Sequence, residues 1–156
     1  MREIILQLVT AFSCSLGFAI VFKVRVGLLI PASIGATLSW AIYLAGMHFQ
    51  KGLFVSCLLA AVMATIYAEV QARVWKAPAT LFLVPSLIPL IPGSTLYYTM
   101  SSIVRGEWET ARDYGGRTIQ YALAIAAGIS LVWAVCTMMS RIRVSIGNKE
   151  FRDESF

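Results

Sequence analysis

The sequence predicts an all-α integral membrane protein, a bundle of about five transmembrane helices in which the fourth is broken by prolines. Three observations lead to this prediction. Of the 156 residues, 58% are hydrophobic and only 13% are charged, and the mean hydropathy is +0.75. The charged residues leave five long stretches without any charge, and three closely spaced prolines lie in one of them. Because ordinary soluble domains carry about 25% charged residues, this composition excludes a soluble enzyme and a disordered chain.

Each uncharged stretch is long enough, or nearly so, to cross a hydrocarbon core of about 30 Å as a helix. In lipid a helix satisfies its own backbone hydrogen bonds, so helices are the expected form. The stretches are Ile4–Phe22, Val26–Gln50, Gly52–Ala68, Ala77–Val104 and Thr118–Ser140. We therefore expect one helical domain over residues 1–140, followed by a polar tail at 141–156. Its transmembrane segments are expected near residues 4–22, 26–47, 52–70, 77–104 and 118–140.

Small residues recur at every fourth position in four of the five stretches, and small faces let helices in lipid approach closely. The spacings include Ser15 and Ala19, Gly35 and Ser39, the line Ala60, Ala64 and Ala68, and Ala124 and Gly128. Four or five short helices make a thin bundle. We therefore expect further helices around it, either from copies of the chain in a homo-oligomer or from another subunit.

The basic residues stand singly at the ends of the stretches, which argues against a nucleic-acid partner despite the net charge of +5. With five full spans, 8 basic residues fall on the side of the C-terminal tail and 5 on the other side. The positive-inside rule then puts the tail in the cytoplasm of a cell-membrane protein. A re-entrant fourth segment would change these counts to 6 and 7, which favours neither orientation.

Aromatic residues near the segment ends are typical of an interfacial belt at the membrane surface. They are Trp40, Tyr43, Tyr67, Trp75, Tyr97, Tyr98, Trp108, Tyr114 and Tyr121. Between the fourth and fifth stretches, the charged segment Arg105–Arg117 is interrupted by Gly115 and Gly116. It predicts a short surface helix or, equally well, a solvated loop.

The fourth stretch cannot be a regular helix in contact with lipid. It contains Pro85, Pro89 and Pro92, followed directly by Gly93. An interior proline removes a helix hydrogen bond and clashes with the preceding turn, at a cost of about 3 kcal/mol or more. Irregular backbone at membrane depth is tolerated where protein or a water-filled cavity surrounds it. We therefore expect a broken helix or a re-entrant pair, buried in the assembly.

Such a break has a functional use. Ser94 and Thr95 are good N-cap residues, and a half-helix that starts there would offer free N–H groups and a positive dipole end to a carboxylate. Broken helices of this kind indicate the substrate site of a transporter. The alternative is a structural kink that lets neighbouring helices cross. The candidate substrate-binding residues are Pro89, Pro92, Gly93, Ser94, Thr95, Tyr97 and Tyr98.

Ionisable residues near the membrane are the candidates for coupling or gating. Glu69 and Arg73 are four positions apart, in the favourable order for a helical ion pair. They predict either an interfacial salt bridge or a coupling carboxylate with its partner. His48, the only histidine, predicts an interfacial residue or a proton relay. The sequence has no metal-ligand cluster, phosphate-binding loop or nucleophile–base motif, so we expect no enzyme, cofactor or metal.

The proline-rich segment and its flanks resemble the threonine/serine exporter family, and in particular its small-subunit type, a domain also catalogued as of unknown function. The resemblance rests on Glu69 to Lys76, on Ala77-Pro78, on the run Pro85 to Ser94 and on Tyr97-Tyr98. Weaker similarity extends over Gly17 to Phe22 and Ile125 to Ile129, so the resemblance covers most of the chain up to about Met139.

The resemblance implies half of a secondary transporter. In that family the small protein pairs with a larger helical membrane subunit, and members are associated with proton-driven export of threonine and serine or of dicarboxylates. It therefore implies export of a small anionic or zwitterionic metabolite through a site near 89–98. Two other functions stay open at this stage: a non-transporting assembly subunit and a small homo-oligomeric channel.

Overall fold

The computed structural model describes the backbone of residues 2–49 and 51–153 and the side chains of 2–49 and 51–139. Within these residues the chain is helical and has no strand, so the predicted fold class is confirmed. The elements are α1 (Arg2–Val21), α2 (Val26–His48), α3 (Leu53–Trp75), α4 (Thr80–Leu87), the 3-10 turn η1 (Ile88–Leu90), α5 (Gly93–Arg105) and α6 (Trp108–Asp153).

Four of the described helices are long and apolar enough to cross a membrane: α1, α2, α3 and residues 108–139 of α6. The fourth uncharged stretch forms two pieces, Thr80–Leu90 and Gly93–Arg105, which are bent by 51° relative to each other. The expected break is therefore present, and it lies where the prolines are. The pair counts as a fifth span if both pieces belong to one crossing.

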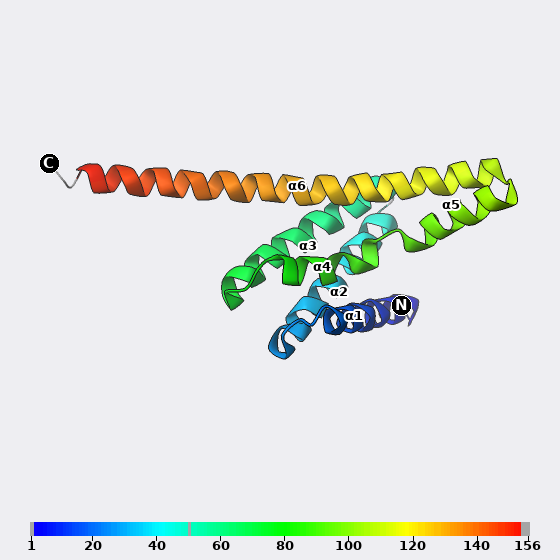
Figure 1. Ribbon diagram of the computed structural model, residues 1–156, viewed down its shortest axis with the longest axis horizontal. Coiled ribbons are helices and arrows are strands. Elements are labelled where there is room, and N and C mark those ends of the chain that lie inside the picture. The colour runs from blue at the N-terminus through cyan, green and yellow to red at the C-terminus, as the bar shows by residue number, and fades with distance from the viewer. Residues whose placement is uncertain (1, 50, 154–156) are drawn as a thin grey trace.

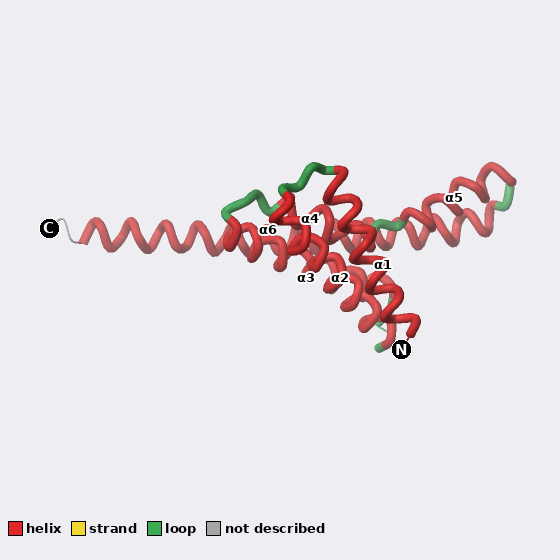
Figure 2. Tube along the Cα trace, turned by 90° about the horizontal axis from the view of Figure 1, so that it is seen from below, coloured by secondary structure: helices red, strands yellow, loops and turns green. Residues whose placement is uncertain are grey.

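The first four helices form the packed part of the molecule. α1 lies against α2, and α4 lies against both α2 and α3. α6 crosses α3 at Gly128, where an added Cβ would come within 2.8 Å of the Ala61 Cβ and 3.2 Å of the Leu58 carbonyl oxygen. α5 packs mainly against the first part of α6, and both Figure 1 and Figure 2 show α5 and this part of α6 projecting away from α1–α4.

Grooves at the two ends of the bundle show which helix ends lie together. Ile4 and His48 line one groove, so α1 begins where α2 ends. Phe22 and Thr80 line another, so α1 ends where α4 begins. At the end of α3, the Arg73 guanidinium lies 4.0 Å from Cys136 of α6. The chain therefore runs back and forth, and α6 runs in the same direction as α3.

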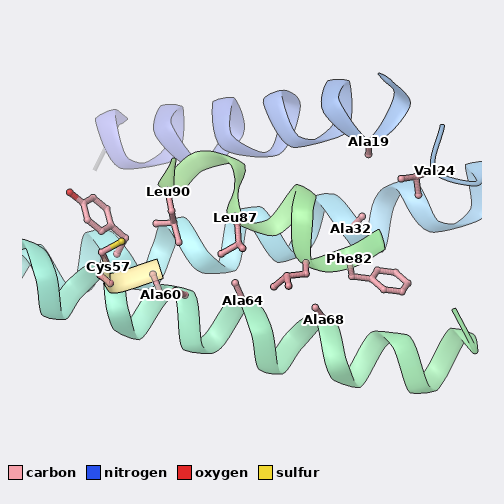
Figure 3. Close-up of a cluster of buried hydrophobic side chains, with 14 of the residues drawn as sticks. Ala19, Val24, Ala32, Cys57, Ala60, Ala64, Ala68, Phe82, Leu87 and Leu90 are labelled. Atoms are coloured by element: carbon pink, nitrogen blue, oxygen red, sulfur yellow. The ribbon is translucent and has the colours of Figure 1, made fainter. Parts of the chain in front are cut away.

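Small residues let the broken segment pack deeply into the bundle. Figure 3 shows Leu87 and Leu90 directed toward α3, whose facing positions are alanines. The α3 residues Ala60, Ala64 and Ala68 are at most 1% exposed, as the small-residue pattern predicts. On α1 the face of Ser15 and Ala19 is the buried one.

The charged segment 105–117 differs from both structures expected for it. Gly106 ends α5 with a φ of +76°, a left-handed conformation that glycine adopts without strain. α6 begins at Trp108 and continues through Gly115 and Gly116 without interruption to Asp153. The expected surface helix or loop is therefore wrong: the segment is the first part of the last helix. A single glycine costs a helix only about 1 kcal/mol, which the packing of α5 offsets.

Gly35 should be required at the contact between α2 and the broken segment. A methyl group there would overlap the Ser86 hydroxyl and approach the Tyr67 ring to 2.9 Å. We expect Gly35→Ala to lower the unfolding free energy in detergent by about 1–3 kcal/mol, the usual cost of overpacking. Gly17→Ala is the control, since an added Cβ at Gly17 meets nothing within 4 Å. If both variants are equally stable in denaturant titrations, α2 and the broken segment have room for a methyl group at Gly35, and the prediction is wrong.

Candidate functional site

The break between α4 and α5 is a compact irregular turn. η1 continues α4 as a single 3-10 turn, and Ile91 then takes an extended conformation with φ −64° and ψ 125°. The Ile91 N–H donates to the Ile88 carbonyl at 3.2 Å, and the Gly93 N–H donates to the Ile91 carbonyl at 2.8 Å. The chain thus satisfies part of its own backbone while it changes direction by 51°.

Serine side chains of α1 and α2 supply donors to the carbonyls of the segment before the break. In a regular helix the Pro85 carbonyl would accept from residue 89, but Pro89 has no N–H. Instead, the Ser15 hydroxyl of α1 donates to the Pro85 carbonyl at 3.0 Å. The Ser39 hydroxyl of α2 donates to the Ser86 carbonyl at 2.7 Å. Ser15, Ser39 and Ser86 are completely buried, so water cannot replace these donors.

The N-terminus of α5 differs slightly from the prediction. The helix begins at Gly93 with Pro92 at the N-cap position, and no side chain caps it. Ser94 and Thr95 are therefore not N-caps, because the chain enters the helix one residue earlier. The Thr95 hydroxyl donates back to the Pro92 carbonyl at 3.2 Å. Within the described residues no acceptor is found for the N–H groups of Ser94 and Thr95, so the predicted open helix end is present.

The predicted substrate-binding residues lie together at this break but do not enclose a cavity. Gly93, Ser94, Tyr97 and Tyr98 are exposed in the single chain. The other three predicted residues, Pro89, Pro92 and Thr95, are partly buried. To enclose a substrate at these residues, another protein surface would have to cover them.

α6 contributes residues to this region that the sequence did not indicate. The Thr118 hydroxyl lies 2.9 Å from the Thr95 hydroxyl and 2.9 Å from the Tyr114 carbonyl oxygen, and it can donate its single proton to either one. The rings of Tyr98 and Tyr114 are 5.2 Å apart. These contacts form because α5 and α6 pack against each other as a helical hairpin. No motif in the sequence predicts that packing.

A cleft lies on the other side of the break, between α1, α2 and η1. It has a volume of about 250 Å³ and is lined by Gln7, Thr10, Ala11, Cys14, Trp40 and Pro89. Of these residues only Pro89 was predicted to belong to the site. Among the described residues, the Trp40 indole nitrogen is the buried side-chain donor without a hydrogen-bond partner. An unsatisfied buried donor costs about 1–3 kcal/mol.

The candidate coupling residues lie at the end of α3. Glu69 and Arg73 form an ion pair at 3.6 Å, with the Glu69 side chain 23% exposed and that of Arg73 69% exposed. The predicted helical pair is therefore formed, although none of the described hydrogen bonds or ion pairs connects it to the break. His48 packs its ring against Phe49, with 5.8 Å between the ring centroids.

Four of the aromatic residues expected at the lipid interface face the protein instead, and one of them, Trp40, stacks on Tyr43 with 5.0 Å between the ring centroids. The hydroxyls of Tyr43 and Tyr121 are 2.5 Å apart and join α2 to α6. The Tyr67 hydroxyl donates to the Pro31 carbonyl at 2.7 Å. Trp75, Tyr97, Tyr98 and Trp108 are exposed, as a belt requires. The prediction used only the closeness of each aromatic residue to a helix end. It could not tell whether the ring lies on the lipid-facing or the protein-facing side of the helix.

The comparison with known families decides the class of the protein. Residues 7–135 match the sequence model of the family described as "Threonine/Serine exporter, ThrE". The chain belongs to the threonine/serine exporter family. The match runs from the first turns of α1 well into α6 and includes the break, so it covers the whole packed bundle. Searches of the curated proteins and of the solved structures gave no match.

Family membership and the apolar helices together make this chain a membrane protein of the exporter type. Within the described residues no group of three or more His, Cys, Asp or Glu side chains could hold a metal ion. Around the break, backbone N–H groups, hydroxyls and the Gln7 amide can form hydrogen bonds.

The serine donors give a direct test of how the break is held. Ser15→Ala leaves the Pro85 carbonyl buried without a donor, so we expect it to lower the unfolding free energy by about 1–3 kcal/mol. Ser33→Ala is the matched control, because Ser33 is equally buried but donates within its own helix, to the Leu29 carbonyl. Denaturant titration in detergent measures both. An equal loss in the two variants would contradict a special role for Ser15.

Proposed function

We propose that this chain is a membrane subunit of a secondary exporter that moves a small amino acid or dicarboxylate out of the cell. The observation that carries the proposal is the family match across an apolar helix pair that is bent by 51° at a break. Open helix ends at such breaks suit the carboxylate of a substrate, because the N–H groups and the helix dipole attract negative charge. The N–H groups of Ser94 and Thr95 are the proposed contacts for that carboxylate.

The proposed transport unit includes a larger helical partner subunit of the same family. The exposed site residues support this, since Tyr97 is 66% and Tyr98 49% exposed in the single chain. A partner helix against α5 would close the site. Homo-oligomerisation would also supply such a wall, and the membrane itself covers the remaining apolar faces.

The proposed location is the cell membrane, with the C-terminal end of α6 in the cytoplasm. The helix ends support this orientation, because 8 of the 13 basic residues, Lys23, Arg25, Arg73 and Lys76 among them, belong to the end of the bundle where α1, α3 and α6 terminate. The positive-inside rule then makes this end cytoplasmic. Export is proposed to be proton-coupled, with Glu69 as the coupling carboxylate and Arg73 as its partner.

A second candidate is a non-transporting assembly subunit that stabilises a partner holding the site. The same exposure of Gly93, Ser94 and the tyrosines favours it, because the single chain does not enclose a substrate. The two functions differ in whether the break itself must contact substrate.

Gly93→Phe separates these two functions. An added Cβ at Gly93 meets nothing within 4 Å, so the variant should fold and assemble, while its ring blocks the open end of α5. We expect at least a tenfold loss of threonine or succinate efflux from preloaded cells. Gly116→Phe, at an equally open helix position, is the control. If Gly93→Phe assembles and exports normally, the proposed substrate site is wrong.

Glu69→Gln tests the coupling role. The amide keeps the shape of the carboxylate but cannot take up and release a proton. We expect efflux driven by an imposed pH gradient to fall at least tenfold in vesicles, while assembly is unchanged. Exposed ion pairs contribute only about 0–1 kcal/mol to stability, so a folding defect is not expected. Unaltered pH-driven efflux would leave Glu69 as a structural ion-pair residue.

A further inference from the structure

The cleft between α1, α2 and η1 carries a polar face on the otherwise apolar helix α1. Gln7, Thr10 and Cys14 are three, four and seven positions apart, so they share one face of α1 and line the cleft together. All three are exposed. The Gln7 amide has no hydrogen bond to any described residue. The Thr10 hydroxyl can donate its single proton to the Leu6 or the Gln7 carbonyl, which leaves its oxygen available to accept.

The wall opposite α1 connects this polar face to the break. Pro89 of η1 and the Trp40 ring of α2 complete the lining. The Trp40 indole nitrogen is buried and has no partner among the described residues. Polar groups that converge on a mainly apolar cleft are typical of small-molecule sites. At about 250 Å³ the cleft suits a small metabolite.

The charges around the cleft restrict what it can hold. None of its six lining residues is an Asp, Glu, Lys, Arg or His. A carboxylate placed there would lose its hydration without gaining a counter-charge, which is strongly unfavourable. A hydroxyl or amide group meets matching donors and acceptors instead.

We propose that this cleft is a specificity subsite that receives the uncharged polar side chain of a net-neutral amino acid and disfavours the second carboxylate of a dicarboxylate. The inference rests on the proposed export function and extends it, since it names residues of α1 and α2 that select the substrate.

Cysteine protection tests the cleft directly in the complex purified from its native host. L-threonine should slow the reaction of Cys14 with N-ethylmaleimide at least threefold, and succinate should not. Cys136, on α6 and outside the cleft, is the internal control. Protection by both molecules, or by neither, overturns the proposed specificity.

Substitution gives a second and independent measurement. The double variant Gln7→Leu with Thr10→Val should reduce threonine efflux at least tenfold, while Gln7→Lys should raise succinate efflux relative to threonine. The control carries the same changes on α6, Gln120→Leu with Thr110→Val. Loss of co-purification with the partner subunit in the cleft variant would instead make the cleft a protein contact and overturn the proposal.

The export function and the specificity subsite are overturned by different results. If the wild-type complex exports neither threonine nor succinate, the proposed export function is wrong. If the wild type exports and the cleft variants behave like the control, only the subsite is wrong.

Discussion

The missing N–H of Pro89 is the constraint on which the rest of the structure depends. It leaves the Pro85 carbonyl without its helical donor in a region that water does not reach, and the Ser15 hydroxyl of α1 replaces that donor. Ser39 of α2 donates to the next carbonyl. These two hydrogen bonds join the broken segment to both neighbouring helices. The position of the segment along α1 and α2 is therefore fixed by contacts with these helices. The alanines of α3 and Gly35 of α2 provide the space that this close approach needs.

A break held in this way presents two different surfaces. Toward α5 it offers a helix end with unpaired N–H groups, bordered by Thr118 and by the Tyr98–Tyr114 pair. Toward α1 it offers an uncharged cleft with hydroxyl and amide groups. A molecule that carries one carboxylate and one neutral polar group matches both surfaces. The exposed tyrosines of α5 indicate the direction from which a second subunit would complete the enclosure.

The fold was predictable to a large extent because hydrophobicity and proline act locally. The uncharged stretches located α1, α2, α3 and the membrane part of α6, and the prolines located the break. The continuity of α6 through Gly115 and Gly116 was not predictable, since packing against α5 outweighs the weak helix propensity of glycine. Gln7, Thr10 and Trp40 were missed as cleft residues because their approach to Pro89 depends on how α1 and α2 pack. Ser15 and Ser39 were recognised as small packing residues, but their role as donors follows only from the carbonyls opposite them.

Substrate is proposed to meet the protein at the break, residues 88–92. An experimental structure of the assembled exporter with L-threonine bound would show whether it does. We expect a helix interrupted at these residues and ligand density at the break, within hydrogen-bond distance of the Ser94 and Thr95 N–H groups. A continuous helix from residue 80 to 105, or ligand density remote from the break, would rule this site out.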